Sequence, residues 1–215
     1  MEITNSSINP NSLVNILTLR YDPSIPPNLP KKNWVQFMSK DNSLDSKTIE
    51  KLICDSIKKK LETLNETKIS IALSGGVDST LVLSLIRKVN PDIDIHAISI
   101  KFADSIDETI DASKIAEKFN AKHHIIHLDN YLSELPKAIS MIKMPFWDIH
   151  WYYVVKESQK FSKILISGDG GDELFGGYTF RYKKFLSLTS ESSSPLDKVL
   201  AYLECHERDR VPDQE

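Results

Sequence analysis

Glycine is confined to two short segments of this 215-residue chain, and both segments also carry acidic and hydroxyl side chains. All seven glycines lie in SGGVDS (74–79) and SGDGGDELFGGY (167–178). Glycine accepts left-handed backbone angles and lets a ligand approach the main chain closely. Each segment follows an apolar, β-rich run, at 69–73 and at 163–166. Two glycine loops at the ends of two strands predict one phosphate-binding site.

The first loop combines the features of an anion site with one acidic side chain. A helix is expected to begin near Val77, and helix N-termini present unpaired N–H groups and the positive end of the helix dipole. Ser74, Ser79 and Thr80 would add hydroxyl donors. Asp78 fits such a loop if Mg²⁺ bridges its carboxylate and the phosphates. The loop lacks the Lys-Ser/Thr ending of a Walker loop, and an ordinary strand–turn–helix corner is the structural alternative.

Both loops resemble signatures of one enzyme superfamily. SGGVDS resembles the pyrophosphate-binding loop of the ATP pyrophosphatases, which split ATP between the α and β phosphates and adenylate a substrate. SGDGGDELFGGY, with three acids and five glycines, resembles the signature of the asparagine synthetase synthase domain. The resemblance extends from Ile69 to Tyr182. It implies an α/β fold of the adenine nucleotide α-hydrolase type, with a doubly wound parallel sheet.

The resemblance also implies roles for individual residues. Those that would contact the nucleotide are Leu73, Ser74, Gly75, Gly76, Asp78, Ser79, Ile100, Ser167 and Gly168. Within this set the first loop would hold pyrophosphate, and Leu73 and Ile100 would frame adenine. Asp78 and Asp172 would bind Mg²⁺. Asp169 would assist adenylate formation or deprotonate the attacking nucleophile, as a positioned carboxylate can.

The implied reaction is ATP-dependent amide formation. A carboxylate, with aspartate as the first candidate, would become an acyl adenylate with release of pyrophosphate, and ammonia would then displace AMP. ATP and Mg²⁺ are the implied cofactors, and a separate ammonia-supplying subunit is one option. Two alternatives stay open: adenylation of another acceptor, as in β-lactam-forming or modifying relatives, and a non-catalytic nucleotide-binding or interaction subunit.

The chain differs from the asparagine synthetase pattern towards both ends. Glutamine-using members carry a nucleophilic cysteine after the initial Met and a glutaminase domain. Here position 2 is Glu2 and about 65 residues precede the first expected strand, so we expect no glutamine hydrolysis. The family's catalytic lysine has no assignable match among the residues after Tyr178. The basic candidates there are Arg181, Lys183, Lys184, Arg208 and Arg210.

Composition indicates a soluble, cytoplasmic enzyme domain. Apolar residues make up 40% of the chain and charged residues 27%, which are globular values. A net charge of −3 provides no electrostatic footprint for nucleic acid or an anionic membrane. There is no apolar run of about 18 residues and no signal peptide. Cys54 and Cys205 lack CxxC spacing and are expected to be reduced; a homo-oligomer is left open.

Hydrophobic periodicity predicts three regions: an extended arm at 1–45 with a short strand at 13–20, a nucleotide-binding domain at 46–190, and a helical tail at 191–215. Helices are expected at 46–64, 77–89, 107–119, 131–142, 148–161, 178–188 and 195–204. Strands are expected at 69–73, 94–102, 123–128 and 163–167. This alternation predicts a parallel sheet with helices on both faces. Ligands bind such sheets beyond the carboxyl ends of the strands, at the switch point.

Two further clusters have ordinary readings. Along a strand, His123 and His127 would share one face while His124 points away, so the three histidines make a poor zinc site. The aromatic cluster of Trp147, Trp151, Tyr152 and Tyr153 is typical of core packing, and lining of an acceptor pocket is the second reading.

Overall fold

The computed structural model describes residues 9–19, 22, 24, 45–103, 105–142 and 149–205. The chain divides into two compact units. The sheet unit consists of Lys32–Ile142 and Asp148–Asp169, and the helical unit of Met1–Lys31, Lys143–Trp147 and Gly170–Glu215. The expected division into arm, domain and tail is a different partition and stays a prediction.

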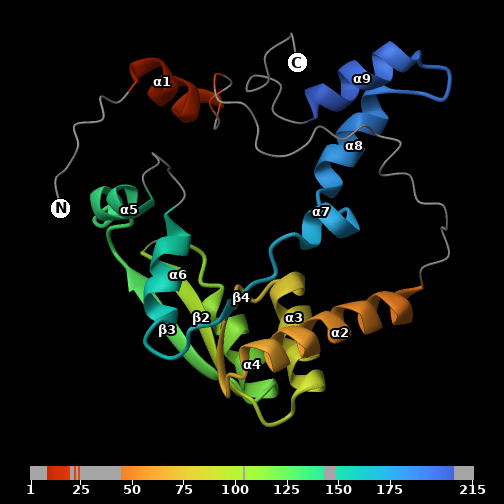
Figure 1. The fold of residues 1–215 in the computed structure, drawn as a ribbon. Helices are drawn as coiled ribbons and strands as arrows, with labels where there is room; N and C mark the ends of the chain where they lie inside the picture. The colour runs from red at the N-terminus through yellow and green to blue at the C-terminus, as the bar shows by residue number, and fades with distance from the viewer. Residues whose placement is uncertain are drawn as a thin grey trace. The chain divides into compact units, whose positions relative to one another are not determined.

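The sheet unit contains a four-stranded, fully parallel sheet, as the alternation of strands and helices predicted (Figure 1). Its strands are β1 (Lys68–Ala72), β2 (Asp94–Phe102), β3 (Lys122–Leu128) and β4 (Leu165–Ile166). Their order is β3-β2-β1-β4. Strands β2 and β3 lie on one side of β1, and β4 lies on its other side. The strand order therefore reverses between β1 and β4, and this is the switch point where such sheets bind ligands.

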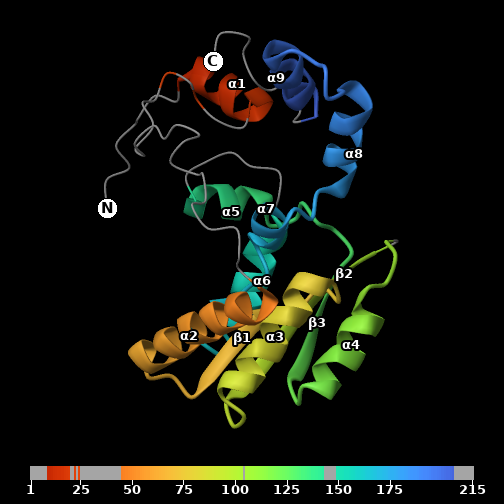
Figure 2. The ribbon, with the colours of Figure 1, turned by 90° about the vertical axis from the view of Figure 1, so that its right-hand side faces the viewer.

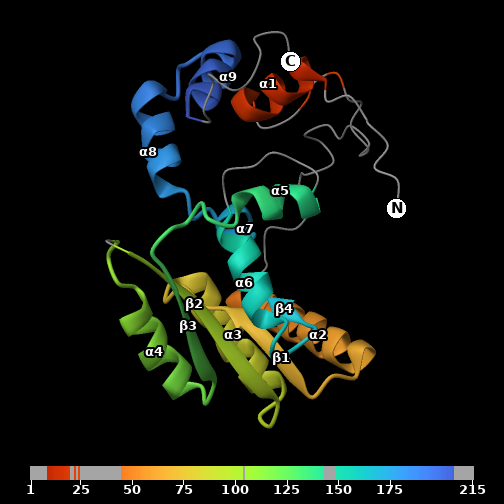
Figure 3. The same ribbon diagram turned by 90° about the vertical axis from the view of Figure 1, so that its left-hand side faces the viewer.

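Helices cover both faces of this sheet, which confirms the doubly wound fold. The helices are α2 (Ser46–Leu64), α3 (Val77–Val89), α4 (Thr109–Lys118), α5 (Leu135–Ile142) and α6 (His150–Ser158). Figure 2 shows α2, α3 and α4 in front of the sheet, and the opposite view in Figure 3 shows α6 in front. Two adjacent residues of β3 support this arrangement, because they contact opposite faces. His123 lies within hydrogen-bond distance of Ser113 on α4, whereas His124 stacks on Phe161, just after α6.

A single apolar core holds β1 and β2 against the helices of one face. Its buried members are Leu61, Ile69, Ile71, Leu73, Leu83, Ile86, Ile93, Ile95, Ala97, Ala112 and Ala116. Burying one Ile or Leu side chain stabilises a fold by about 1.5–3 kcal/mol. Ala112 and Ala116 are fully buried, and their small side chains let α4 lie close to the sheet. The loops that follow β1 and β4 are thus anchored on well-packed strands.

The described helices of the helical unit are α1 (Pro10–Leu19), α7 (Gly171–Phe175), α8 (Thr179–Leu188) and α9 (Pro195–Glu204). The expected strand at 13–20 is wrong, because the chain is helical up to Leu19 and Arg20 lies outside the described residues. Leu13, Ile16 and Leu17 recur at helical spacing, and Pro10 occupies the first helical position, where its missing N–H costs nothing. The short helix α7 was not expected from the sequence.

The other expected helices and strands are confirmed with small shifts at their ends. Helix α2, helix α3, strand β2 and helix α9 have the expected bounds. The helix expected at 131–142 begins at Leu135, and the helix expected at 148–161 spans His150–Ser158. Differences of this size are usual where element ends are predicted from local signals, and the strand expected at 163–167 is shortened to Leu165–Ile166.

None of the helices in the described part of the chain has both the length and the apolar composition needed to cross a bilayer. Both cysteines are free thiols; Cys205 is buried and Cys54 is half-buried.

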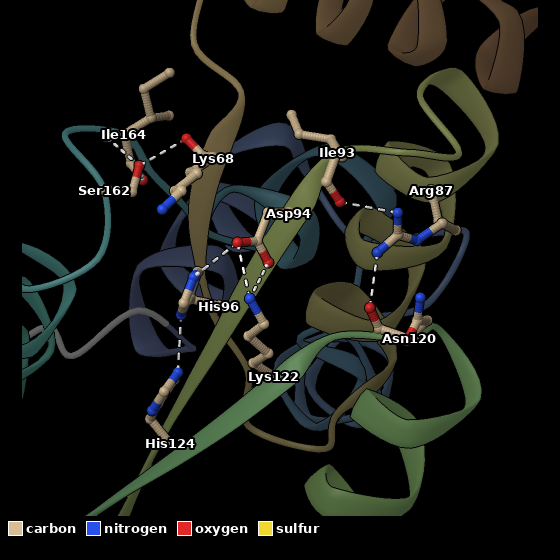
Figure 4. A network of polar contacts seen from close by, with 10 residues as sticks. All are labelled: Lys68, Arg87, Ile93, Asp94, His96, Asn120, Lys122, His124, Ser162 and Ile164. Carbon is tan, nitrogen blue, oxygen red and sulfur yellow. Dashed lines mark hydrogen bonds and ion pairs between the residues drawn. The ribbon is translucent and has the colours of Figure 1, made fainter.

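One arginine clamps the connections at the end of the sheet opposite the glycine loops. Arg87, in the last turn of α3, donates to the carbonyl oxygens of Pro91 at 2.6 Å, Ile93 at 2.9 Å, Phe119 at 2.9 Å and Asn120 at 2.9 Å. Figure 4 shows the bonds to Ile93 and Asn120. A planar guanidinium with five donors suits this task better than a lysine. The side chain therefore ties α3 to the start of β2 and to the end of α4.

We expect Arg87→Ala to lower the free energy of unfolding by roughly 2–4 kcal/mol, because bonds from a charged donor are strong and four carbonyls lose a partner at once. Urea unfolding measures the change. Lys88→Ala is the matched control, since Lys88 makes an exposed ion pair with Glu50 that contributes less than about 1 kcal/mol. Equal losses in the two variants would contradict the clamp.

Candidate functional site

A cavity of about 310 Å³ lies at the carboxyl ends of β1, β2 and β4, within the sheet unit. It is lined by Ala72, Leu73, Ser74, Asp78, Ser79, Ile98, Ser99, Ile100, Phe102, Glu108, Thr109, His150, Trp151, Val154, Ser167, Gly168 and Asp169. Eight of these were predicted to contact the nucleotide or to act in catalysis: Leu73, Ser74, Asp78, Ser79, Ile100, Ser167, Gly168 and Asp169. The structure thus brings most of the predicted site together, and the role of each residue stays a prediction.

The first glycine loop presents the open N-terminus of α3. Gly76 is the N-cap residue and offers no side chain to bond the first turn. Gly75 has a φ of +80° and lies against α4, where a Cβ atom would come 3.3 Å from the Glu108 carbonyl oxygen. The exposed N–H groups and the dipole of α3 therefore favour an anion at this point.

The hydroxyl groups of this loop mainly hold the loop itself. Ser74 Oγ accepts from the Gly76 N–H at 3.2 Å and lies 3.2 Å from Ser79 Oγ. Ser79 is buried and donates to the Gly76 carbonyl at 3.3 Å. Thr80 also donates to the Gly76 carbonyl, at 2.7 Å, and is absent from the cavity lining. The predicted hydroxyl donors thus make the loop rigid, and Thr80 turns away from the cavity.

The second glycine loop contacts the first. Ser167, Gly168 and Asp169 follow β4, and a Cβ atom on Gly168 would lie 2.8 Å from the Ser79 nitrogen and 2.9 Å from the Asp78 carbonyl carbon. Real Cβ atoms do not come this close to a backbone, so only glycine fits here. The two loops therefore meet, as a single site requires, and the prediction that they bind phosphate together stays a prediction. Asp169 stands exposed at the mouth of the cavity.

The cavity wall is acidic. Asp78, Glu108 and Asp169 belong to its lining, which includes no lysine or arginine among the residues that the structure describes. Asp107, next to Glu108, accepts from the Thr109 hydroxyl at 2.6 Å and the Thr109 N–H at 3.0 Å. These bonds hold the pKa of Asp107 below its usual value. Asp107 thus holds Thr109 at the start of α4, and Glu108, the N-cap residue of that helix, is among the lining residues.

The helix α6 supplies a wall that sequence reasoning only partly anticipated. His150, Trp151 and Val154 line the cavity. Tyr153 is buried and donates to the Tyr131 carbonyl at 3.0 Å, and Tyr152 donates to Glu134 at 2.8 Å. The aromatic cluster therefore divides between packing and cavity lining, and Trp147 lies outside the described residues. His150, Glu108 and Thr109 were missed, because their places on the cavity wall depend on how α4 and α6 pack against the strands.

Asp172, the second predicted metal ligand, belongs to the helical unit, in the first turn of α7. A Cβ atom on Gly177 would overlap its carboxylate, at 1.7 Å from Oδ1. Its neighbour Glu173 accepts from the Tyr178 hydroxyl at 2.6 Å, which lowers the pKa of Glu173. The glycine therefore leaves room for the Asp172 side chain, and the metal role of Asp172 stays a prediction.

The histidines of β3 point to opposite faces, as the strand alternation predicted. His123 Nε2 lies 2.7 Å from Ser99 Oγ, whereas His124 Nε2 lies 2.9 Å from His96 Nδ1 on the other face. Within the residues that the structure describes, no three His, Cys, Asp or Glu side chains are grouped so as to hold a metal ion.

Fold and site define the class of protein: a doubly wound parallel α/β fold with a glycine loop and an open helix N-terminus at its switch point. The chain belongs to the asparagine synthase family, because the asparagine synthase family model matches residues 48–211. This is a family of ATP-dependent carbon–nitrogen ligases. The resemblance inferred from the two loop motifs is thereby confirmed.

The matching relatives are longer proteins. The putative glutamine-hydrolyzing asparagine synthetase 2 of Methanocaldococcus jannaschii is 33% identical over 134 residues, covering 60% of this chain and 26% of the relative. The glutamine-hydrolyzing asparagine synthetase 1 of Bacillus subtilis is 28% identical over 180 residues, covering 80% and 28%. A solved ammonia-dependent NAD synthetase from Campylobacter jejuni matches with a TM-score of 0.46 and 20% identity, over 78% of this chain and 77% of that chain. The matched part of the chain thus spans little more than a quarter of the length of the two asparagine synthetases.

Proposed function

We propose that this chain carries out ATP-dependent amide formation of the asparagine synthetase type. It adenylates a carboxylate, with aspartate as the first candidate, releases pyrophosphate, and transfers ammonia to the acyl adenylate. The observation that carries the proposal is the meeting of two glycine loops at the open N-terminus of α3, inside a cavity at the switch point. Membership in the asparagine synthase family supports the same chemistry.

The acidic lining argues for Mg²⁺ as a companion of ATP. The triphosphate is strongly anionic, and the described part of the cavity lining offers carboxylates but no lysine or arginine to neutralise it. Asp78 is a hard oxygen ligand of the kind that Mg²⁺ takes, together with phosphate oxygens and water. Asp78 would be one ligand of the ion, and Asp172 is the second ligand that the family resemblance implies. When bound, it supplies positive charge that stabilises the pyrophosphate leaving group.

The bond changes balance in two steps. A carboxylate oxygen of the acceptor bonds to the α-phosphorus, and the bond from that phosphorus to the bridging oxygen breaks, so pyrophosphate leaves with the electron pair. The nitrogen of ammonia then bonds to the acyl carbon, and the carbon–oxygen bond to AMP breaks. The attacking nitrogen must lose a proton, and Asp169 is the candidate acceptor because its exposed carboxylate stands at the cavity mouth.

Asp169→Asn is expected to lower turnover on the order of 10²-fold or more, because an amide keeps the size of the side chain but cannot take up a proton. Asp169→Glu should keep part of the activity. ATP affinity and thermal stability should be unchanged in both variants. Initial-rate kinetics with a parallel ATP-binding titration distinguish this from a turn-forming role, which would weaken binding or stability instead. Full turnover in Asp169→Asn would remove it as the base.

Turnover with aspartate and ammonium should yield AMP and pyrophosphate in equal amounts and should stop when Mg²⁺ is chelated. Quantifying both products tests the reaction. ATP–pyrophosphate exchange without ammonium, measured over a panel of carboxylic acids, then identifies the acceptor. ADP and inorganic phosphate as primary products would contradict adenylation.

A second candidate is adenylation of a different acceptor. Among the described residues the cavity lining contains His150 but no lysine or arginine that could pair with a second carboxylate of aspartate, which favours an acceptor whose charge is met elsewhere or is smaller. An acid other than aspartate that dominates the exchange panel would support this candidate. ATP binding without exchange for any acid would instead favour a nucleotide-binding subunit.

A further inference from the structure

A chain of four hydrogen bonds crosses the sheet unit beside the cavity. His123 Nε2 lies 2.7 Å from Ser99 Oγ, and Ser99 Oγ lies 2.5 Å from the Leu73 carbonyl oxygen. On the other side, His123 Nδ1 lies 2.8 Å from Ser113 Oγ, which lies 2.8 Å from the Thr109 carbonyl oxygen. The chain thus begins at the residue that enters the first glycine loop and ends at the first turn of α4.

Both ends of this chain belong to the cavity. Leu73 and Thr109 line it, and so does Ser99, which is itself buried. His123 lies behind this wall, on β3, and is absent from the lining. Any influence of the imidazole on a bound ligand must therefore pass through Ser99 and the Leu73 carbonyl on one side, or through Ser113 and Thr109 on the other.

Counting protons shows that the four bonds cannot all form around a neutral ring. Each serine hydroxyl has one hydrogen. If both hydroxyls donate to backbone carbonyls, both ring nitrogens must donate, and His123 must be a cation. Burial, and secondly the neighbouring His124, lower the pKa of His123, so the ring is neutral at neutral pH. One hydroxyl must then donate to the ring and release its carbonyl.

The distances select which hydroxyl turns. The Ser99 bond to the Leu73 carbonyl is the shorter of the two, at 2.5 Å against 2.8 Å for Ser113 and Thr109. A side-chain bond back to a helix carbonyl, as Ser113 makes, is an optional addition to the helix. The Ser113 hydroxyl is therefore free to turn to Nδ1 at small cost, which leaves the hydrogen of the ring on Nε2.

We propose that His123 is a positioning residue of the nucleotide site: held as its Nε2–H tautomer by Ser113, it donates to Ser99, whose hydroxyl fixes the Leu73 carbonyl at the entrance of the first glycine loop. The inference rests on the proposed function, because it assigns the residue to ATP binding. The other titratable groups nearby are His124, His127 on the same face of β3, Lys101 on β2, and the exposed Asp111–Lys114 pair on α4. The hydrogen-bond partners of the His123 ring are the hydroxyls of Ser99 and Ser113.

Two amide substitutions distinguish the role of His123 Nε2 from the role of Nδ1. In His123→Gln the side-chain amide reaches the position of Nε2 and can donate to Ser99, whereas in His123→Asn it reaches only the position of Nδ1. We expect Gln to bind MgATP like the wild type and Asn to bind it roughly three- to tenfold more weakly, the effect of losing one hydrogen bond. His127→Gln, two residues along the same face, should leave binding unchanged. Equal affinities in the Gln and Asn variants would overturn the proposal.

Nitrogen NMR of the imidazole tests the tautomer without any ligand. We expect His123 to carry its proton on Nε2 at neutral pH, and the amide signal of Ser74, which shares a peptide bond with the Leu73 carbonyl, to shift in His123→Asn but not in His123→Gln. A charged ring or an Nδ1–H tautomer would overturn the proposal. If the wild type bound no ATP, the proposed function would fail, and these two signals would still decide whether the bonded chain exists.

Discussion

Replacing Asp78 by Asn is expected to lower ATP–pyrophosphate exchange by at least about 10²-fold, the scale at which losing one charge-stabilising group acts in enzymes. Asp78 lines the cavity at the start of α3, and no lysine or arginine among the described lining residues offsets the triphosphate. The amide removes one negative oxygen ligand for Mg²⁺ while keeping the size of the side chain. The deficit should shrink as the Mg²⁺ concentration is raised.

Stability should change little in this variant. The carboxylate of Asp78 interacts with the dipole of α3, which contributes about 0.3–1 kcal/mol. Asp111→Asn is the matched control, because Asp111 also lies in the first turn of a helix, α4, yet is exposed, pairs with Lys114 and stays outside the cavity lining. The control should keep full exchange. Near-wild-type exchange in Asp78→Asn at modest Mg²⁺ would remove Asp78 as a ligand, and the same assay on Asp172→Asn tests the second predicted ligand.

Local signals explain why so much of the sheet unit could be predicted. The bounds of α3 and β2 follow from apolar periodicity and from the glycine loop that precedes α3, all within about ten residues. The parallel order then follows from the alternation of strands and helices. The places of Leu73 and Ser167 in the cavity lining could then be predicted, because the carboxyl ends of parallel strands meet at the same edge of the sheet.

The parts that could not be predicted depend on contacts between distant residues. Glu108 and His150 become cavity walls only because α4 and α6 pack on opposite faces of the same strands. The bond between His123 and Ser99 joins residues 24 positions apart, and it requires the β2–β3 register. The strand prediction at 13–20 was wrong for a different reason, because five apolar residues among asparagines fit a strand and a helix alike. Only the placement of Pro10 and the i, i+3, i+4 spacing favour the helix.

Gly168→Ala is expected to weaken MgATP binding at least about tenfold and to lower stability by roughly 1–3 kcal/mol, the range for overpacking a close contact. Gly168 is a case where two effects oppose each other. Adding a methyl group at an ordinary backbone angle stabilises a protein by about 0.4–1 kcal/mol, because the unfolded chain loses freedom. Here the methyl would lie 2.8 Å from the Ser79 nitrogen and 2.9 Å from the Asp78 carbonyl carbon. Both atoms belong to the backbone of the first turn of α3 and cannot rotate away, so the clash outweighs the gain.

The consequence is specific to the site, because either β4 or the first turn of α3 must move, and each carries residues of the cavity wall. Gly76→Ala is the stability control: its φ of −74° suits any residue, and its Cβ would meet only the Ser74 hydroxyl, at 3.2 Å, which can turn aside. Thermal unfolding should therefore show a lowered midpoint for Gly168→Ala and little change for Gly76→Ala. A Gly168→Ala protein that unfolds at the wild-type temperature and binds MgATP with wild-type affinity would show that the two glycine loops do not need this contact, and the single-site interpretation of the loops would lose its structural support.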